Sequence, residues 1–210
     1  MPKIAYYPGC SGQSTSLEYD LSTRAVCRAL DLELVELDDW SCCGSTPAHT
    51  VNHVLSAALS ARNLALAEQQ NLDMVTTPCP SCLSNLRTAA HKMEDAAFRE
   101  KANALLDTPC TKNIEAQSVL QVISEQVGAD SIRAKVVKPL SGLKLACYYG
   151  CIMNRPPELM QFDGHGYPHS CARCGGFALS AQGGMLRRIV WRTQGGHCHQ
   201  TFRQAARCRP

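Results

Sequence analysis

The sequence predicts an α/β fold built on a parallel sheet, and three observations support this fold class. Short apolar segments alternate with segments of helical periodicity through the first half of the chain, in the order strand, helix, strand, helix, strand, helix. Each of the three predicted strands is followed closely by a cysteine. The sequence of the first strand also recurs later in the chain. Alternation of this kind is typical of parallel strands joined by crossover helices.

The predicted strands are short apolar runs that end at Pro, Gly or Asp. They cover residues 4–7, 34–37 and 74–77. The predicted helices are the intervening segments in which apolar residues recur every three or four positions. They cover residues 14–30, 51–70 and 84–106. A further helix is expected over 116–127, ending at Gly128, and residues 138–142 are expected to form a connector.

Five cysteines follow the ends of these strands. Cys10 follows the first strand, and after 31 intervening residues the adjacent pair Cys42-Cys43 follows the second. After 35 more residues, Cys79 follows the third strand and forms a Cys-x-x-Cys with Cys82. Open parallel sheets bind ligands at the carboxyl ends of their strands, so we expect these thiols to converge at one edge. Helix N-termini at that edge would favour a negatively charged, thiolate-rich site.

The chain contains 13 cysteines in 210 residues, which is unusual for a protein without disulfides. The first residues carry no apolar signal region, and no apolar run is long enough to span a membrane. We therefore predict a cytoplasmic protein without a transmembrane segment, in which thiols serve metal or redox chemistry. The odd number of cysteines also argues against a fully paired disulfide framework.

The five strand-end cysteines suit an iron–sulfur cluster better than a zinc ion. Adjacent side chains on an extended chain point to opposite faces, so a vicinal pair is an awkward donor to one tetrahedral ion. Five thiolates also exceed the four ligands that structural zinc takes, whereas neighbouring irons of a cluster can each take a terminal thiolate. The alternative is that the five are scattered core thiols, which would require three strand ends to carry them by chance.

The opening of the chain is repeated. Residues 3–10 match residues 144–151 at a constant offset of 141, and Cys151 is the repeat partner of Cys10. An internal duplication implies two similar domains. A complete second copy would place a cysteine pair at positions 183–184, where the sequence has Gly183-Gly184, and a Cys-x-x-Cys beyond position 210. The second copy is therefore incomplete.

The composition changes sharply near residue 164. Residues 164–210 contain seven arginines and no Asp, Glu or Lys, whereas residues 1–163 carry a net charge of −4. This basic Gly/Arg/Cys-rich tail is either a divergent C-terminus or a frameshift product, and the abrupt loss of acidic residues favours the frameshift. No aromatic stacking set accompanies the arginines, so nucleic acid is not expected as a partner. A weaker alternative for the tail is a zinc site, formed by Cys171-x-x-Cys174 and His197-Cys198-His199.

The cysteine pattern resembles one known family. Cys10-x31-Cys42-Cys43-x35-Cys79-x2-Cys82, with a glycine after the pair, resembles the cysteine-rich CCG domain, and in particular the B subunit of heterodisulfide reductase. The Tyr-Tyr-x-Gly-Cys opening of the first repeat fits the same family, and the second repeat keeps its Tyr-x-Gly-Cys. The resemblance covers residues 1–163.

The resemblance implies a Rossmann-like, three-layer domain that holds a noncubane [4Fe–4S] cluster on five cysteines. It implies a first CCG domain over 1–141, the start of a second repeat over 142–163, and the atypical tail over 164–210. In the family, a disulfide substrate lies between two clusters and is reduced in single-electron steps. The electrons come from a small iron–sulfur protein (the C subunit) and a flavin protein (the A subunit), so proteins similar to these two are the expected partners.

Carried over residue by residue, the resemblance assigns the first cluster to one complete set of ligands: Cys10, Cys42, Cys43, Cys79 and Cys82. Only Cys151 matches the second site, as a remnant, so a second cluster is doubtful. The leading interpretation is an iron–sulfur subunit of a heterodisulfide reductase-like oxidoreductase complex. The alternatives are a catalytically impaired cluster- or metal-binding module, and another CCG oxidoreductase of the succinate, lactate or glycolate type.

A few residues outside the motif have individual predictions. His49 follows the cysteine pair and is a candidate proton donor to a departing thiolate, with a structural hydrogen bond as the alternative. Trp40 is expected to shield the cluster. Cys27 is predicted to be a small core residue, and Cys110 has no predicted partner. Cys147 is predicted to serve packing, with a role beside the cluster as the alternative.

Overall fold

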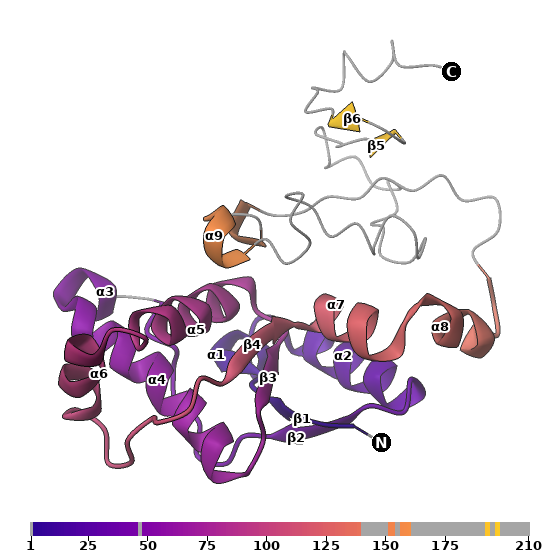
Figure 1. Ribbon diagram of the computed structural model, residues 1–210. Helices are drawn as coiled ribbons and strands as arrows, with labels where there is room; N and C mark the ends of the chain where they lie inside the picture. The colour runs from indigo at the N-terminus through magenta and orange to yellow at the C-terminus, as the bar shows by residue number, and fades with distance from the viewer. Residues whose placement is uncertain are drawn as a thin grey trace.

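The computed structural model describes residues 2–45, 48–139, 151–153, 156–160, 192–193 and 196–197. A parallel four-stranded sheet forms its centre, in the order β2-β1-β3-β4 (Figure 1). The strands are β1 (Lys3–Tyr6), β2 (Glu33–Glu36), β3 (Met74–Thr77) and β4 (Glu115–Ser118). The α/β class and the parallel sheet predicted from the sequence are thus confirmed. Most of the predicted second repeat and the tail lie outside the described residues.

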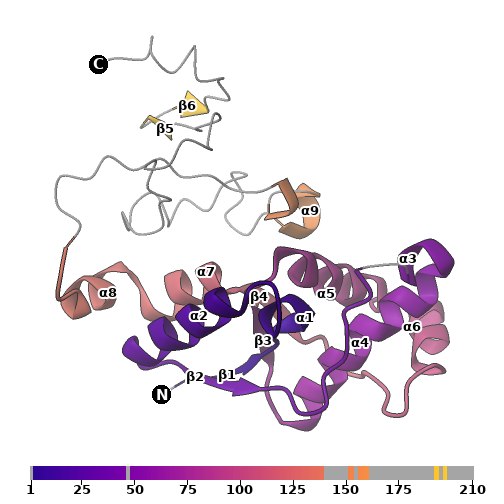
Figure 2. The same cartoon turned by 180° about the vertical axis from the view of Figure 1, so that it is seen from behind.

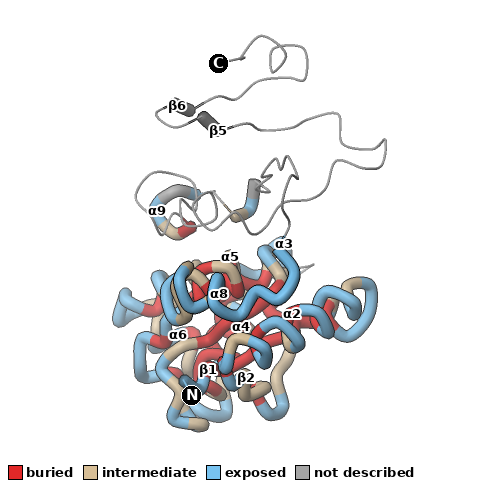
Figure 3. The backbone as a smooth tube through the Cα atoms, turned by 90° about the vertical axis from the view of Figure 1, so that its right-hand side faces the viewer, coloured by how far each residue is buried: buried red, intermediate tan, exposed pale blue. Residues whose placement is uncertain are grey.

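Each central strand sends alternate side chains to the two faces of the sheet, because successive residues of a strand point in opposite directions. Ala5 and Val75 belong to one apolar core, whereas their neighbours Ile4 and Met74 contact a second core on the other face. The sheet is therefore buried on both sides, as parallel sheets usually are. Figure 3 shows buried residues inside the domain and exposed residues along its outer surface.

Helices α4 (His53–Gln69), α5 (Pro80–Lys92) and α6 (Ala96–Asn103) cover one face, with α3 (Ala48–Val51) before them. The helical segments on the other face are α2 (Leu17–Ala29), α7 (Val119–Val122), the π-helical turn η1 (Ile123–Val127) and α8 (Ala129–Lys135). Figure 2 shows the two groups from behind, on either side of the strands. The layers are helix, sheet and helix. The short α1 (Gly9–Gly12) follows β1 at the carboxyl edge.

Two predicted helices have different bounds in the structure, and a side-chain cap explains each difference. Asn52 caps α4 by accepting hydrogen bonds from the Val54 and Leu55 N–H groups at 2.8 and 3.1 Å, so the predicted 51–70 helix begins at His53, and residues 48–51 form the separate α3. Asp95 caps α6 in the same way, and the predicted 84–106 helix becomes α5 and α6. Asn and Asp favour these N-cap positions because their side chains satisfy free helix N–H groups.

Residues 115–118 form strand β4, so the prediction that a helix starts at residue 116 was wrong. Glu, Ala and Gln have little intrinsic preference for strands, but this segment pairs in register with the whole of β3. Its Gln117 is buried and donates to Glu115 and Glu125 at 2.8 and 3.1 Å. The helix begins only at Val119, where the Ser118 hydroxyl caps α7.

Helix α2 begins later than predicted and turns a different face inward. The apolar spacing that predicted it includes Leu17 and Leu21, which are 45% and 58% exposed. Its buried residues are Asp20, Thr23 and Cys27. A polar contact and apolar packing both hold this face, since the Tyr6 hydroxyl donates to the Asp20 carboxylate at 2.6 Å and Cys27 belongs to the second apolar core.

The short segments 151–153 (the 3₁₀ turn η2) and α9 (Pro157–Met160) pack against α5. Arg87 of α5 donates to the Leu159 and Met160 carbonyls at 2.9 and 3.4 Å, and to the Ala116 carbonyl of β4 at 2.7 Å. Met160 is buried in the core beneath α5. One guanidinium thus joins α9 to the main sheet. Strands β5 (Arg192–Thr193) and β6 (Gly196–His197) form a separate antiparallel pair.

Candidate metal centre

The thiols predicted from the sequence lie beyond the carboxyl ends of three adjacent strands. Cys10 lies in α1 after β1, Cys42 and Cys43 follow β2, and Cys79 follows β3. Cys82 lies in the first turn of α5. All five are free thiols; Cys43 and Cys82 are buried, Cys79 is partly buried, and Cys10 and Cys42 are exposed. The site therefore has a buried side and a side open to solvent.

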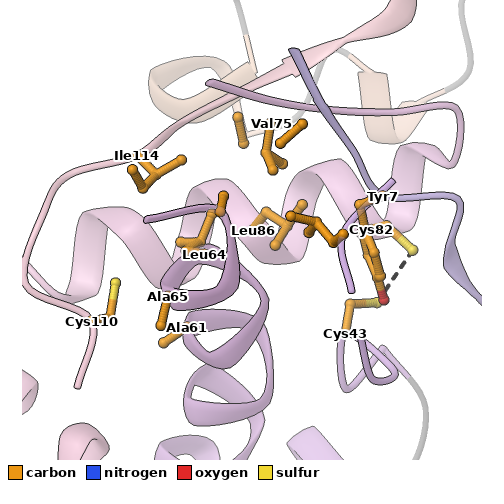
Figure 4. Packing of buried hydrophobic residues seen from close by; sticks show 14 of the residues in the cluster. Tyr7, Cys43, Ala61, Leu64, Ala65, Val75, Cys82, Leu86, Cys110 and Ile114 are labelled. Atoms are coloured by element: carbon orange, nitrogen blue, oxygen red, sulfur yellow. Dashed lines mark hydrogen bonds between the residues drawn. The ribbon is translucent and has the colours of Figure 1, made fainter. Parts of the chain in front are cut away.

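Tyr7 marks the point at which the thiols meet. Burial raises the pKa of its phenol, and the neighbouring thiols of Cys82, Cys43, Cys42 and Cys10 raise it further because each disfavours a second negative charge. Partial desolvation and then Cys42, Cys43 and Cys79 raise the pKa of Cys10. The five thiols are therefore within electrostatic range of one another. Figure 4 shows Tyr7 beside the Cys43 and Cys82 side chains.

Cys82 is hydrogen-bonded to two other thiols of the site. Its sulfur lies 3.4 Å from the Cys43 sulfur. This hydrogen bond lowers the pKa of Cys43 to about 6 against the opposing effect of burial. A hydrogen bond with Cys82 likewise lowers the pKa of Cys79 to about 5, and the two bonds raise the pKa of Cys82 itself. The site thus favours thiolates at Cys43 and Cys79, and the thiolate is the form that ligates metals.

The backbone at Gly9 makes room for Cys82. Gly9 has φ +70°, and a Cβ atom there would lie 2.9 Å from the Cys82 sulfur and 3.9 Å from the Cys79 Cβ. Residues with a side chain rarely adopt this φ, and the first of these contacts is closer than real Cβ atoms come. The glycine between Tyr7 and Cys10 therefore allows the chain that follows β1 to approach the Cys-x-x-Cys closely.

The start of helix α5 adds a favourable field for thiolates. Cys79 is the N-cap residue and Pro80 follows at the first helical position, where its missing N–H is no loss. The partial positive charge at a helix N-terminus stabilises nearby anions. Backbone N–H groups of Ser81 and Cys82 and the Ser11 hydroxyl also lower the Cys79 pKa.

Polar side chains from α4 and α5 bind the backbone at the cysteine pair. The Ser60 hydroxyl donates to the Cys43 carbonyl at 2.8 Å, and the Asn85 amide donates to the same carbonyl at 3.4 Å and to the Cys43 sulfur at 3.6 Å. The Tyr7 hydroxyl donates to the Ser41 carbonyl at 2.8 Å. Hydrogen bonds to ligand sulfurs and their backbone tune reduction potentials in iron–sulfur proteins.

Trp40 lies against Tyr7 with ring centroids 5.4 Å apart in an edge-to-face arrangement. Its indole N–H donates to Glu36 at 3.2 Å, and Glu36 pairs with Arg24 at 2.6 Å. Arg24 also binds the buried Asp20. Trp40 therefore covers Tyr7, the residue at the centre of the thiols, but its predicted role as a shield for a cluster stays a prediction.

The other predicted residues lie apart from this edge or outside the described chain. His49 lies exposed on α3, and no hydrogen bond or ion pair joins it to the thiols within the described part. Cys27 is buried in the second core, as predicted. Cys151 is in the turn η2, next to α5, and its side chain is not described. The remaining candidates lie outside the described residues: Cys147, Cys171, Cys174, Cys198 and His199.

The donor set fits an iron–sulfur cluster better than a single ion. In the ranges that the structure describes, no three His, Cys, Asp or Glu side chains are gathered closely enough to hold one metal ion. Five thiols exceed the four ligands of a tetrahedral ion, whereas a cluster offers several irons to which they can bind. The Ser41 hydroxyl, next to Cys42, is buried and has no hydrogen-bond partner in the described residues, which leaves a donor free beside the thiols. The space that Gly9 leaves for the Cys82 sulfur supports the same conclusion.

The residues that organise the thiols were not predicted from the sequence. Tyr7 was assigned only to a buried strand, and the bonds from Ser60 and Asn85 join helices to a loop far away in sequence. One signal was available, because Asn85 lies three residues after Cys82 and so on the same face of a helix. No local pattern identifies Ser60.

The chain is similar to known proteins over the region that contains all five thiols. Residues 4–87 match the family described as "CCG: Cysteine-rich domain". The 8-methylmenaquinol:fumarate reductase membrane anchor subunit of Wolinella succinogenes is 35% identical over 171 residues, which are 80% of this chain and 59% of that protein. A protein of Archaeoglobus profundus, named as similar to the B subunit of heterodisulfide reductase, is 32% identical over 167 residues, which are 76% and 54% of the two chains.

The chain thus spans less than two thirds of each of these curated relatives. Among the helices in the described ranges, none is long and apolar enough to cross a membrane.

Proposed function

Because this chain is a cysteine-rich CCG domain protein, as its cysteine spacing predicted, we propose that it is an iron–sulfur subunit of a heterodisulfide reductase-like complex. The observation that carries the proposal is the grouping of five thiols at three adjacent strand ends, around one tyrosine. The ligands are Cys10, Cys42, Cys43, Cys79 and Cys82. The noncubane form of the [4Fe–4S] cluster is inferred from the family resemblance.

When bound, a [4Fe–4S] cluster supplies single-electron transfer. The residues of this chain have separate tasks around it. Cys43, Cys79 and Cys82 form the buried side of the ligand set, while the exposed Cys10 and Cys42 form the side that a substrate can reach. The ring of Tyr7 limits the access of water on the buried side, since Tyr7 is fully buried.

The proposed substrate is a thiol or disulfide, which approaches from the side of Cys10 and Cys42. The proposed partners are an iron–sulfur protein similar to the C subunit and a flavin protein similar to the A subunit, and the proposed compartment is the cytoplasm. These assignments rest on the resemblance to the B subunit of heterodisulfide reductase and on the relative from Archaeoglobus profundus. His49 remains a proposed proton donor.

Metal analysis of the anaerobically purified chain tests the cluster. About four irons and four acid-labile sulfides per chain are expected for a single cluster. One zinc per chain with no sulfide would contradict the proposal. The matched control is the same chain after chelation under denaturing conditions, refolded without iron, which should carry neither element.

A second candidate has its own support. The relative from Wolinella succinogenes, named as the membrane anchor of an 8-methylmenaquinol:fumarate reductase, is 35% identical to this chain. The alternative function is therefore electron transfer in a complex of the fumarate reductase type. Mixing the reduced, cluster-containing chain with an organic disulfide or with a menaquinone analogue separates the two. Reoxidation by the disulfide supports the first, and reoxidation by the quinone alone supports the second.

The third candidate is a cluster-binding module that has lost catalysis. The incomplete second repeat supports it, because Gly183-Gly184 stands where a second pair is expected. Such a module would contain iron and sulfide but would be reoxidised by neither the disulfide nor the quinone.

A further inference from the structure

The two adjacent cysteines of the site lie in opposite environments. Cys42 is exposed, whereas Cys43 is 2% exposed. Successive side chains of an extended chain point in opposite directions, so a rotation or a one-residue shift of this loop would exchange the two thiols. Some feature of the fold must therefore fix which thiol points inward.

We propose that Asn63 of α4 is the positioning residue that holds Cys43 inward and Cys42 outward. The functional importance of this positioning rests on the proposed function, because a cluster needs a defined thiol at each ligand position. The structural content of the proposal does not depend on a cluster. It concerns the loop of the chain itself.

Asn63 binds both backbone groups of the residue before the pair. Its side-chain oxygen accepts a hydrogen bond from the Ser41 N–H at 2.9 Å, and its side-chain N–H donates to the Ser41 carbonyl at 3.0 Å. This is the pairing that a neighbouring strand would provide. Asn63 is fully buried, and its amide also donates to the Leu59 carbonyl of its own helix at 3.2 Å, which restricts the side chain.

The other bonds to this loop do not have the same effect. Tyr7 reaches only the Ser41 carbonyl and Ser60 only the Cys43 carbonyl, while Asn85 reaches the Cys43 carbonyl and sulfur at 3.4 and 3.6 Å but no backbone group of Ser41. A single hydrogen bond allows the peptide to pivot about it. Two bonds from one rigid amide to the N–H and C=O of one residue fix the orientation of that residue, and thereby the direction of the side chains that follow.

A matched control is present in the same chain. Asn103 of α6 binds the backbone of Cys110 in the same two-point manner, with the Cys110 N–H donating to Asn103 at 3.1 Å and the Asn103 amide donating to the Cys110 carbonyl at 3.2 Å. Cys110 is not one of the proposed ligands. Loss of the Asn103 clamp should loosen the fold locally without changing the cysteine pair.

The test is the relative alkylation of Cys42 and Cys43 in the cluster-free chain, at one pH, with a limiting amount of iodoacetamide. Trypsin releases both cysteines in the peptide 29–62, which contains no other cysteine, and tandem mass spectrometry assigns the label to either position. In the unsubstituted chain, Cys42 should react first. In Asn63→Leu, the ratio of Cys42 to Cys43 labelling should fall ~10-fold or more, because both hydrogen bonds to Ser41 are lost. In Asn103→Leu, the ratio should not change.

An unchanged ratio in folded Asn63→Leu overturns the proposal, and so does an equal fall in Asn103→Leu, since that would be general loosening. Where circular dichroism shows that Asn63→Leu does not fold, Asn63→Asp replaces it. Asp keeps the acceptor for the Ser41 N–H but turns an oxygen toward the Ser41 carbonyl, so the same fall is expected. Since no iron is present, a failed cluster proposal would appear in the metal analysis and leave this test unaffected.

The same variants have a spectroscopic readout after anaerobic reconstitution with iron and sulfide. Asn63→Leu should change the EPR spectrum of the bound cluster relative to the unsubstituted chain. Asn103→Leu should leave the spectrum unchanged while lowering the melting temperature. A spectrum unaffected by Asn63→Leu at full iron loading would contradict the positioning role.

Discussion

Two groups of cysteines in this chain are buried to the same degree but have different neighbouring side chains. Cys43 and Cys82 at the sheet edge are each 2% exposed, while Cys27 and Cys110 in the cores are 1% and 3% exposed. The first two lie sulfur to sulfur at 3.4 Å and near further thiols. Cys27 packs among apolar residues such as Ile4 and Leu32. Figure 4 shows Cys110 on the other side of the apolar core from Cys43 and Cys82.

The pKa values of the two edge thiols move in opposite directions, because the hydrogen bonds that lower the pKa of Cys43 and Cys79 raise that of Cys82, whereas both core thiols shift upward. Hydrogen bonding with Cys82 lowers the pKa of Cys43 to about 6, whereas burial raises the pKa of Cys110 to about 11 and that of Cys27 above its ordinary value. Burial alone keeps a thiol neutral and inert, and a neighbouring donor converts a buried thiol into a thiolate. The surroundings of a cysteine, rather than its depth, separate the predicted ligands from core residues.

The largest contrast is expected from replacing one cysteine of each group by serine. Cys43→Ser removes a buried thiolate and should abolish or severely reduce the iron content of the anaerobically purified chain. Cys27→Ser should keep the iron content and lower the free energy of unfolding by about 1–3 kcal/mol, because a hydroxyl replaces a thiol in an apolar core. Iron analysis and denaturant unfolding measure the two effects. Equal iron loss in both variants would remove the distinction between the groups.

A smaller contrast is expected at two glycines with positive φ. Gly9→Ala and Gly128→Ala both place a side chain in an unfavourable conformation, at a cost of roughly 1–2 kcal/mol each. At Gly128 the added Cβ meets nothing within 4 Å, whereas at Gly9 it would lie 2.9 Å from the Cys82 sulfur. Gly9→Ala should therefore reduce iron binding in addition to stability. Gly128→Ala should reduce only the melting temperature.

A third contrast compares adjacent tyrosines at the end of β1. Both are fully buried, but the Tyr7 hydroxyl donates to the Ser41 carbonyl at the site and the Tyr6 hydroxyl donates to Asp20 on α2. Each Phe variant should lose about 1 kcal/mol of stability, more for Tyr6→Phe because the buried carboxylate loses a partner. Only Tyr7→Phe should change the EPR spectrum of the reconstituted chain. A spectral change of the same size in Tyr6→Phe would show that the spectrum reports general loosening.

The sequence predicted the elements that local patterns encode. The three strands that precede the cysteines were found because each is a short apolar run closed by a turn residue, and β3 was placed correctly to the residue. Strand β4 was missed because pairing with β3, not its own composition, makes it a strand. The break at Asp95 was missed because a capping residue inside a periodic segment is outweighed by the periodicity.

The site shows the same division. The cysteines were found from their spacing along the chain, which is a local property combined with one rule about parallel sheets. Asn63, Ser60 and Asn85 bind the pair and its neighbour across 17 to 42 residues, and only the position of Asn85 three residues after Cys82 is a local signal for any of these contacts. The ligand types could therefore be predicted, whereas the side chains that orient them required the tertiary structure.

The smallest expected effect is the pH dependence of thiol reactivity in the cluster-free chain. Cys79, with a pKa of about 5, should be a thiolate throughout the neutral range, so its alkylation rate should be nearly constant from pH 7 to 9. A thiol with the ordinary pKa of 9.0 would instead gain about tenfold per pH unit over most of that range. Cys110 should react slowly at every pH because it is buried. Peptide mass spectrometry after timed alkylation measures both rates.

The two thiols should also affect stability in opposite directions. The folded-state pKa of Cys79 lies below that of the unfolded chain, so its contribution is complete above pH 9 and is lost as the pH falls toward 5. The folded-state pKa of Cys110 lies above the unfolded value, so its contribution is present below pH 9 and is lost as the pH rises toward 11. Replacing Cys79 by Ser should therefore flatten the acid side of the stability profile, and replacing Cys110 by Ser the alkaline side. If both replacements changed the same side of the pH–stability profile, edge and core thiols would not differ in how their ionisation affects stability.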